Sequence, residues 1–449
     1  MKKNNFLLAC AFILSLGFCT ISCDDNNDNH IYQQPTISIE DPSGKGEVMV
    51  GKSITLKAAV KHADEAAIVW TVNGKEAGRG AELTLKGEQT GDQYLVKATV
   101  TNEEGEQRAD LSIVVYGKYK YGTFVLNEGN MTSEDGFVTF INPEGEVTNK
   151  AFFEENGKYL GNALQDMCIA NGKIYFVSQN GNRNGGEGHF VIANAETLKK
   201  EAAYTGDDFA FNWPAHIAAI GSNVFIQQND GIVWFNETTG TFKMVENTGS
   251  VQKKPMLAFN NKIFASAGNN LLVLENKNGN FETKTVNCGN KIEGITKADD
   301  NHLWIACGGT PSSIVKINAE NYSLEDKHDI TEISLSSGWE NSFTTSSKGD
   351  SIYMRKGMTI YRHIFSQNTT EKLVVLNEKL ENAGMMYNNI NVHPTTGEVY
   401  ANTIKGYGND YLINDISVWN FNGNEPVMTT NLQNYTHFPT GIYFTESFR

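Results

Sequence analysis

A pattern that recurs along most of the chain constrains its fold more than any other feature. Short apolar triplets follow one another at intervals of 50, 50, 39, 40, 49 and 47 residues. Each triplet is followed, after a polar and Gly-rich gap, by a second apolar run. The triplets begin at Phe124, Ile174, Val224, Ile263, Leu303, Ile352 and Val399. Several short strands in a repeat of about 40–50 residues are typical of the blades of a β-propeller.

The two ends of this repeated region complete each other. A candidate first strand precedes every triplet except the one at Phe124. Residues 441–444 have the look of such a strand, yet no triplet follows them. Pairing of this run with the first blade would remove two exposed sheet edges. The sequence therefore predicts an all-β fold with a seven-bladed propeller over residues 120–449, closed by its C-terminal strand.

Residues 33–117 are expected to form a separate, smaller unit. Six runs with alternating apolar and polar residues lie between positions 36 and 115 and are separated by turn residues. This spacing is typical of an antiparallel sandwich. Trp70 is expected to be buried on a central strand of it. The segment is similar to bacterial Ig-like and PKD modules, and this resemblance implies a spacer.

One segment of this unit matches a phosphate-binding pattern. Residues 46–53 fit G-x-x-x-x-G-K-[ST] at every position. Such a loop needs a helix after it, because backbone N–H groups and the helix N-terminus must face the phosphates. Residues 54–60 alternate and predict a strand instead. We interpret residues 50–53 as a hairpin turn and expect no nucleotide there.

The first 22 residues are typical of a lipoprotein signal peptide. Two lysines precede an apolar run at positions 6–18, which is shorter than a membrane-spanning helix. The residues around Cys23 resemble a bacterial lipobox, which implies lipidation of Cys23. An ordinary secretory signal with a chance cysteine is the alternative. Residues 23–32 form an acidic tether that resembles the export run of surface lipoproteins from Bacteroidetes-type bacteria.

Composition narrows the range of partners. The formal net charge of −15 argues against nucleic acid. No other apolar stretch has the length needed to cross a bilayer, so we expect attachment to the outer membrane by lipid, with the protein facing outward. Cys168, Cys288 and Cys307 lack paired spacing, and we interpret them as core residues, not as disulfides or zinc ligands.

Two kinds of loop are expected to meet on one face of the propeller. They are the loops between the second and third strands of a blade and the loops that lead into the next blade. Large aromatic, amide and cationic side chains are frequent in them, which indicates a contact surface for a polar, partly apolar small molecule. The candidate ligand-binding residues are Asn127, Glu128, Asn130, Gln179, Asn180, Arg183, Phe211, Trp213, Gln228, Trp339, Arg355, Tyr387, Tyr407, Tyr411, Tyr435 and Phe438.

Two segments carry a resemblance to a known family. Residues 125–130 read Val-Leu-Asn-Glu-Gly-Asn, and residues 164–175 run from Leu-Gln-Asp-Met to Lys-Ile-Tyr. They are similar to surface propeller lipoproteins of gut Bacteroidetes, a DUF5074-type family that includes cobalamin-capturing proteins. The resemblance implies capture of a corrinoid or similar nutrient at the propeller mouth and its delivery to a TonB-dependent outer-membrane transporter. It implies a monomer apart from that transporter, with no resident cofactor.

Two other functions stay open. A propeller hydrolase or lyase would use carboxylates or histidines near the axis, and the candidates are Glu128, Asp166, His216 and His437. Asp166 and His216 begin adjacent inner strands and could approach one another. No ordered catalytic motif or clustered metal ligands support a reaction class, so we expect no enzyme. The second alternative is an adhesion module that binds glycans or proteins.

Overall fold

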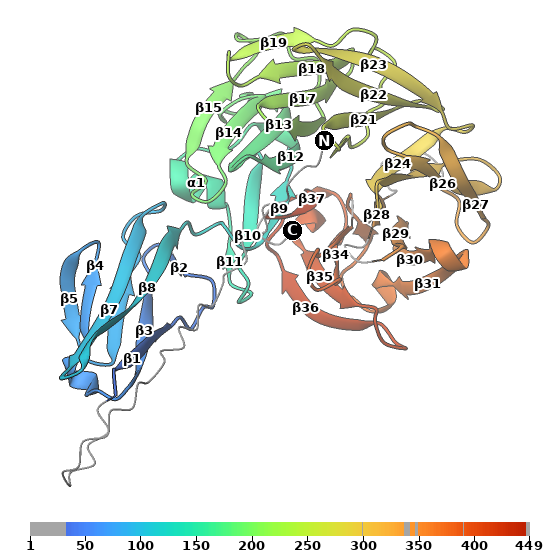
Figure 1. Cartoon of the computed structure of the whole chain (residues 1–449). Coiled ribbons are helices and arrows are strands. Elements are labelled where there is room, and N and C mark those ends of the chain that lie inside the picture. The colour runs from blue at the N-terminus through green and yellow to red at the C-terminus, as the bar shows by residue number, and fades with distance from the viewer. Residues whose placement is uncertain (1–32, 299, 336–341, 346–348, 389, 446–449) are drawn as a thin grey trace, which may run out of the picture. The chain divides into compact units, whose positions relative to one another are not determined.

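The computed structural model describes residues 33–298, 300–335, 342–345, 349–388 and 390–445 (Figure 1). The predicted signal peptide, Cys23, the tether and Trp339 lie outside these residues. Contacts divide the chain into two compact units. One unit contains residues 54–85 and 94–113 together with the chain up to residue 46, and the other contains residues 47–53, 86–93 and 114–449.

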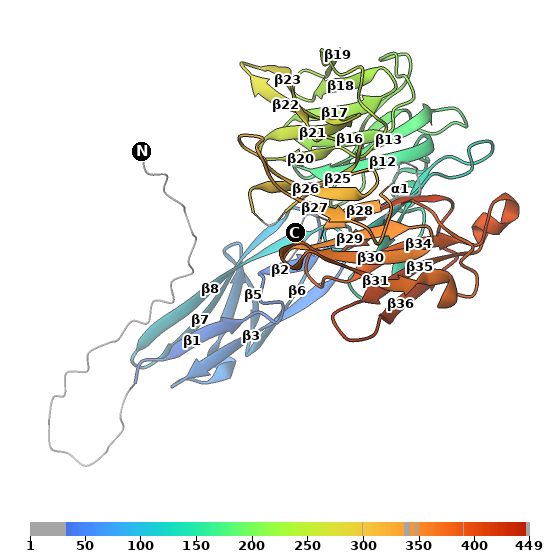
Figure 2. The ribbon, with the colours of Figure 1, turned by 90° about the vertical axis from the view of Figure 1, so that its right-hand side faces the viewer.

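The strands between residues 36 and 116 form two sheets. One sheet has the order β1 (Thr36–Glu40), β3 (Ser53–Lys61) and β6 (Glu82–Lys86). The other has the order β2 (Glu47–Met49), β8 (Gly105–Tyr116), β7 (Gln93–Asn102), β4 (Val69–Val72) and β5 (Lys75–Arg79). The long strands β7 and β8 lie side by side in both views (Figures 1 and 2). Trp70 on β4 is fully buried, as predicted, and its Nε1 donates a hydrogen bond of 2.8 Å to the carbonyl of Gly80.

The segment that matches the phosphate-binding pattern is followed by strand β3 and not by a helix, as predicted. Its interpretation as a hairpin turn is wrong. Strand β2 pairs in parallel with β8, whereas β3 pairs with β1, so residues 50–52 connect two different sheets. Turn residues are found both in a hairpin and in a connection between two sheets. Only the partners of the flanking strands distinguish these two structures.

Seven small sheets follow, within the described residues, and five of them are meanders of consecutive antiparallel strands. The strands, sheet by sheet, are β9 (Thr123–Asn127), β10 (Phe137–Ile141), β11 (Val147–Thr148) and β37 (Pro439–Phe444); β12 (Asn162–Ala170), β13 (Lys173–Gly181), β14 (Phe190–Asn194) and β15 (Lys200–Tyr204); β16 (His216–Ile220), β17 (Asn223–Gln228), β18 (Gly231–Asn236) and β19 (Thr241–Met244); β20 (Leu257–Phe259), β21 (Lys262–Ala267), β22 (Asn270–Lys277) and β23 (Asn280–Asn287); β24 (Ile292–Lys297), β25 (His302–Cys307), β26 (Ser312–Asn318) and β27 (Leu324–Ile330); β28 (Ser342–Thr345), β29 (Ser351–Lys356), β30 (Thr359–Ile364) and β31 (Thr369–Val375); β32 (Met385–Met386), β33 (Asn391–Val392), β34 (Val399–Ile404), β35 (Asn414–Asn420) and β36 (Val427–Gln433).

Apolar clusters fill the spaces between neighbouring sheets. The triplet side chains alternate between the two faces of each sheet. Phe124 belongs to the cluster shared with the second sheet, and Val125 belongs to the one shared with the seventh. Each fully buried Phe or Val contributes about 1.5–3 kcal/mol relative to the exposed side chain. In Figure 1 these sheets lie around a common centre, with β15, β19, β23, β27, β31 and β36 at the outside. The all-β prediction with a propeller-like second part is confirmed.

The C-terminal strand β37 completes the first sheet. It pairs antiparallel with β9, and Ile442 and Tyr443 lie opposite Val125 and Phe124. The C-terminal run thus supplies the missing strand of the first sheet, as the sequence predicts. A short α-helix, α1 (Ala151–Asn156), precedes β12. No helix of the described residues is long and apolar enough to span a bilayer.

Candidate functional site

The course of the strands places two kinds of loop at one edge of the sheets. In each meander the second strand ends, and the third begins, at the edge where the fourth ends and the next sheet begins. We call this edge the mouth face. It includes the β9–β10 loop, the β34–β35 loop and the connections that lead into β12, β16 and β37.

Four aromatic rings gather on the mouth face around Phe438. Tyr411 stacks on Phe438 with centroids 4.3 Å apart and an interplanar angle of 16°. The rings of Tyr387 and Tyr407 lie 5.4 Å and 6.2 Å from Phe438. Tyr407 remains 58% exposed. We call these four residues the Phe438 cluster. Tyr407 is exposed and the other three rings are half-buried beside it, so the cluster presents an amphipathic surface to solvent.

A half-buried carboxylate adjoins this cluster. Glu128 accepts a hydrogen bond of 2.9 Å from the Tyr387 hydroxyl, and its backbone N–H donates to the carbonyl of Phe438. Burial raises the pKa of Glu128, and hydrogen bonds from Tyr387 and Gln165 only partly oppose this. The donors at Glu128 are neutral, so the site holds a carboxylate that accepts a proton or a cationic group readily.

The pKa of a second carboxylate nearby, Glu134, is shifted in the opposite direction. Glu134 Oε2 lies 2.7 Å from His437 Nδ1, and Lys150 Nζ lies 3.4 Å from Glu134 Oε1. Burial acts to raise the pKa of Glu134, but His437 and Lys150 together hold it below its ordinary value. Since the His437 ring meets Tyr411 edge-on at 5.5 Å, this ionised group borders the Phe438 cluster.

Trp213 forms a separate group on the mouth face. Its indole is 56% exposed, and Lys253 Nζ lies 5.4 Å from the ring centroid. Lys253 also lies 3.4 Å from Gln179 Oε1. An ammonium over an exposed indole contributes about 0.5–1 kcal/mol. This arrangement fixes the Lys253 head group beside an open aromatic face.

Trp213 and Phe438 share an unusual backbone. Both have φ of 53°, in the left-handed region, and both precede a proline and an inner strand. This conformation costs about 1–3 kcal/mol for a bulky residue and persists only where its surroundings impose it. The sequence analysis missed this relationship, although the repeated aromatic–Pro pair ahead of β16 and β37 is a visible signal.

Asp166, His216 and Tyr443 meet between the inner strands β12, β16 and β37. His216 Nδ1 lies 3.0 Å from Asp166 Oδ2, so the expected approach of these two residues is confirmed. The Tyr443 hydroxyl donates to Asp166 Oδ1 at 2.5 Å. Burial, followed by the charge of Asp166, raises the pKa of Tyr443 well above its ordinary value. Sequence reasoning did not find Tyr443, which reaches Asp166 because its ring lies over Gly441.

Three predicted site residues are buried, and their side chains form hydrogen bonds with the backbone of the mouth loops. Asn127 is fully buried, and its Oδ1 accepts a hydrogen bond from the backbone N–H of His437. Gln228 is buried and accepts from the N–H of Asn212, beside Trp213. Arg355 is only 1% exposed and donates to the carbonyl of Gly357. These side chains hold loops in position.

The other predicted residues are spread over the mouth face. Asn180 donates to Asn162 Oδ1, and Asn130 accepts from the backbone N–H of Thr132. Arg183 is exposed in the β13–β14 loop. Phe211 packs against His189 and belongs to an aromatic group under the surface, and Tyr435 packs against the cluster between the seventh and first sheets. The structure does not bring all these residues into one group.

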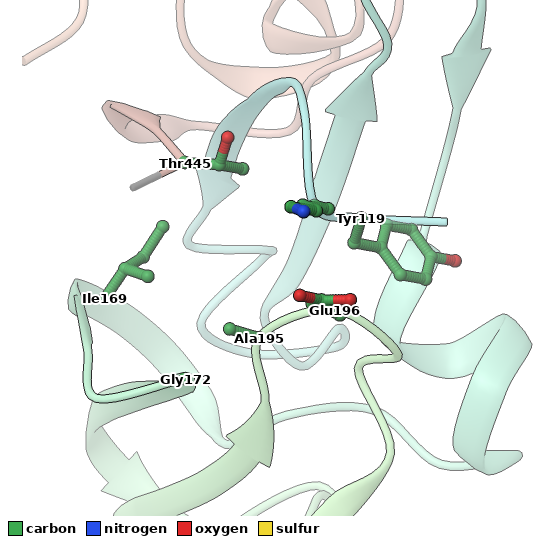
Figure 3. Close-up of a pocket in the computed structure, with 7 residues that line it drawn as sticks. Tyr119, Ile169, Gly172, Ala195, Glu196 and Thr445 are labelled. Atoms are coloured by element: carbon green, nitrogen blue, oxygen red, sulfur yellow. The ribbon is translucent and has the colours of Figure 1, made fainter. Parts of the chain in front are cut away.

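A small cavity lies at the opposite edge of the first two sheets. It has a volume of about 60 Å³ and is lined by Tyr119, Lys120, Ile169, Gly172, Ala195, Glu196 and Thr445 (Figure 3). Ligand sites typically measure about 300–1,000 Å³. This cavity has room for ordered water and not for a nutrient-sized molecule.

These features define a class of protein, an all-β chain with a PKD-like N-terminal part and a propeller-like second part that carries aromatic loops on one face. The PKD-like domain family matches residues 34–102. The family described as a domain of unknown function, DUF5074, matches residues 121–445. The chain belongs to the DUF5074 family, as its resemblance implies.

Three solved structures are similar to this chain. The first is a quinonprotein alcohol dehydrogenase-like protein from Bacteroides thetaiotaomicron, with a TM-score of 0.54 and 15% identity over 92% of this chain and 99% of that one. Two auxiliary nutrient binding proteins have TM-scores of 0.37 and 11% identity. That from Bacteroides thetaiotaomicron covers 81% of this chain and 94% of its own, and that from Bacteroides ovatus covers 82% and 95%. At these identities the likeness concerns the fold alone. No curated protein matches the chain.

Proposed function

We propose that this protein is a binding protein, not an enzyme, and that it captures a small-molecule nutrient at the mouth face. The observation that carries the proposal is the Phe438 cluster beside the half-buried carboxylate of Glu128. Rings fixed in position by their neighbours lose little entropy when a ligand stacks on them, and this preorganisation raises affinity. The family resemblance makes a corrinoid the first candidate.

Calorimetry tests this proposal. Cyanocobalamin and cobinamide are titrated into the wild-type protein and into Tyr407→Ala and Tyr411→Ala. We expect binding to the wild type and a loss of about fivefold or more in each variant, since stacking on one ring is worth about 1 kcal/mol or more. Met428→Ala removes an apolar side chain that is 40% exposed on β36, away from the mouth face, and is the control. If neither cyanocobalamin nor cobinamide gave detectable heat at micromolar concentration, the corrinoid proposal would be wrong.

The proposal includes delivery of the ligand to a TonB-dependent outer-membrane transporter, with the protein anchored by lipid on Cys23 and exposed at the cell surface. Exposed apolar side chains on the mouth face support a docking role, among them Met131, Tyr407 and Leu412. Cys23→Ala is expected to abolish incorporation of labelled palmitate and to release the protein from membranes. Recovery of a TonB-dependent transporter with the affinity-tagged wild type, and its loss after mutation of Leu412 to Asp, would support delivery.

Glycan binding is the second candidate. Trp213 and Tyr407 expose more than half of their surface, and such rings can stack on sugars. A glycan array distinguishes the two functions. Binding of an oligosaccharide that Trp213→Ala abolishes, together with no corrinoid binding, would favour the second candidate.

A further inference from the structure

His216 occupies a position from which it can bond to a ligand. It is the first residue of β16, at the mouth face, and 20% of its side chain is exposed. Its Nδ1 faces Asp166 Oδ2 at 3.0 Å. Among the described residues, no group forms a hydrogen bond with its Nε2. One ring nitrogen is therefore fixed by the protein and the other remains open.

The surroundings of Asp166 determine the tautomer of His216. Asp166 Oδ1 accepts from the Tyr443 hydroxyl at 2.5 Å and from the backbone N–H of Met167 at 2.8 Å. Asp166 Oδ2 accepts from the N–H of Ile217 at 3.2 Å as well as facing His216. Because the carboxylate only accepts, this network assigns the proton of neutral His216 to Nδ1 and leaves a lone pair on Nε2.

A carboxylate behind a histidine is the arrangement that orients metal-binding imidazoles and makes them more basic. We propose that His216 Nε2 coordinates the metal centre of the captured molecule, a planar chelate with an exchangeable water at one axial position. This inference rests on the proposed function. The lone pair of Nε2 forms the new bond, one metal-bound water leaves, and no electron is transferred. The equatorial donors belong to the chelate, so one protein nitrogen is sufficient.

His216 lies between the two aromatic groups of the mouth face. On one side, Asp166 follows Gln165, which hydrogen-bonds to Glu128 beside the Phe438 cluster. On the other side, Trp213 stands three residues before His216 on the same connection. A chelate whose metal meets His216 would thus have aromatic rings toward both of its edges, and Glu128 would accept hydrogen bonds from its donor groups.

Spectroscopy tests the metal bond directly. Aquocobinamide is added to the full-length protein, and its visible bands are recorded. We expect a shift from the water-ligated to the nitrogen-ligated spectrum in the wild type and no such shift in His216→Gln. With the cobalt(II) form, electron paramagnetic resonance is expected to show threefold splitting from one axial nitrogen, absent in the variant. Hemin is the second probe, and a response to hemin alone would identify the cargo as a porphyrin.

His302→Gln is the matched control, because His302 also has a carboxylate partner, Glu325, but lies at the start of β25, at the edge opposite the mouth face. It is expected to keep the spectral shift. Binding heat without a spectral change in the wild type would overturn the metal bond and leave nutrient capture intact. An identical spectral shift in His216→Gln would also overturn the metal bond and leave nutrient capture intact. Absence of binding for both probes would overturn this inference and the chelate version of the proposed function together.

Asp166 acts on the metal only through His216, as a positioning residue. We expect Asp166→Asn to weaken binding of aquocobinamide by about 10–100-fold, as for other carboxylates behind metal-bound histidines. Tyr443→Phe, which keeps Asp166 in place, is expected to weaken it less. Thermal unfolding of both variants separates loss of the fold from loss of the bond. An unchanged nitrogen-ligated spectrum and affinity in folded Asp166→Asn would refute the positioning role.

Discussion

Tyr443 donates a hydrogen bond of 2.5 Å to Asp166, although the two residues are 277 positions apart. Tyr443 lies on β37, which completes the first sheet, and Asp166 lies on β12 of the second sheet. This contact therefore ties the last strand of the chain to a sheet with which it does not pair.

Tyr443→Phe removes this hydrogen bond and keeps the ring. We expect a loss of about 1.5–3 kcal/mol in the free energy of unfolding, because the acceptor is a buried carboxylate that Tyr443 helps to satisfy. Urea denaturation measures it. Tyr407→Phe, at a 58% exposed position, is the control and is expected to leave stability unchanged. A loss no larger than that of the control would mean that water replaces the hydroxyl.

Glu128→Gln tests the raised pKa of the half-buried Glu128 carboxylate. A folded-state pKa above the unfolded value contributes stability that is present below the unfolded pKa and is lost as pH rises through the folded one. We expect the stability of Glu128→Gln relative to wild type to be greater at pH 7 than at pH 4. Denaturation at both pH values measures this difference.

Glu134→Gln is the matched control for Glu128→Gln, since the pKa of Glu134 is lowered. Its stabilising contribution is present above the unfolded pKa and is lost as pH falls through the folded one. The pH dependence of this variant relative to wild type should therefore have the opposite sign. The same sign for both variants would contradict the assignment of the two carboxylates.

His363 is expected to make the protein sensitive to acid. It is fully buried on β30, and burial, followed by the nearby charge of His328, lowers its pKa to about 4. Stability should fall as pH decreases from about 6.5 to about 4, because only the unfolded chain then binds the proton easily, with an upper limit of about 3 kcal/mol. Denaturation across this range is expected to show a shallower decrease for His363→Gln. An equal slope in both proteins would contradict the burial of His363 as a neutral group.

Trp213→Ala is expected to lower ligand affinity about three- to tenfold without changing the unfolding midpoint. The indole is 56% exposed and contributes little to the core, yet it holds Lys253 by a ring contact. Calorimetry with the ligand and thermal unfolding measure the two effects. Leu324→Ala, a half-exposed position on β27, is the control for loss of apolar surface.

The regular spacing of the apolar triplets was sufficient to predict the strands, because each triplet must alternate between two buried faces. The role of residues 441–444 followed from one unpaired strand at each end. Strands β2 and β5 escaped prediction, since neither has a full alternating run. The interpretation of residues 50–53 as a hairpin failed because a turn does not reveal which strands pair.

The candidate functional site could be predicted less well from the sequence than the fold. Asn127, Gln228 and Arg355 are polar residues at strand ends that were assigned to the surface, but the neighbouring loops bury them. Their burial depends on contacts with segments far along the chain, as when Asn127 accepts from His437. Loop composition predicted the aromatic character of the mouth face, but only the backbone dihedrals distinguish Trp213 and Phe438 from the other rings.

The pairing of β37 with β9 also implies an order in which the sheets fold. During synthesis the N-terminal end emerges first, so β9 has no partner strand until roughly three hundred further residues have followed. The intervening sheets can assemble from local contacts in the meantime. The last step of maturation is then the capture of a waiting strand edge, and a chaperone that shields β9 until then would protect the protein from aggregation.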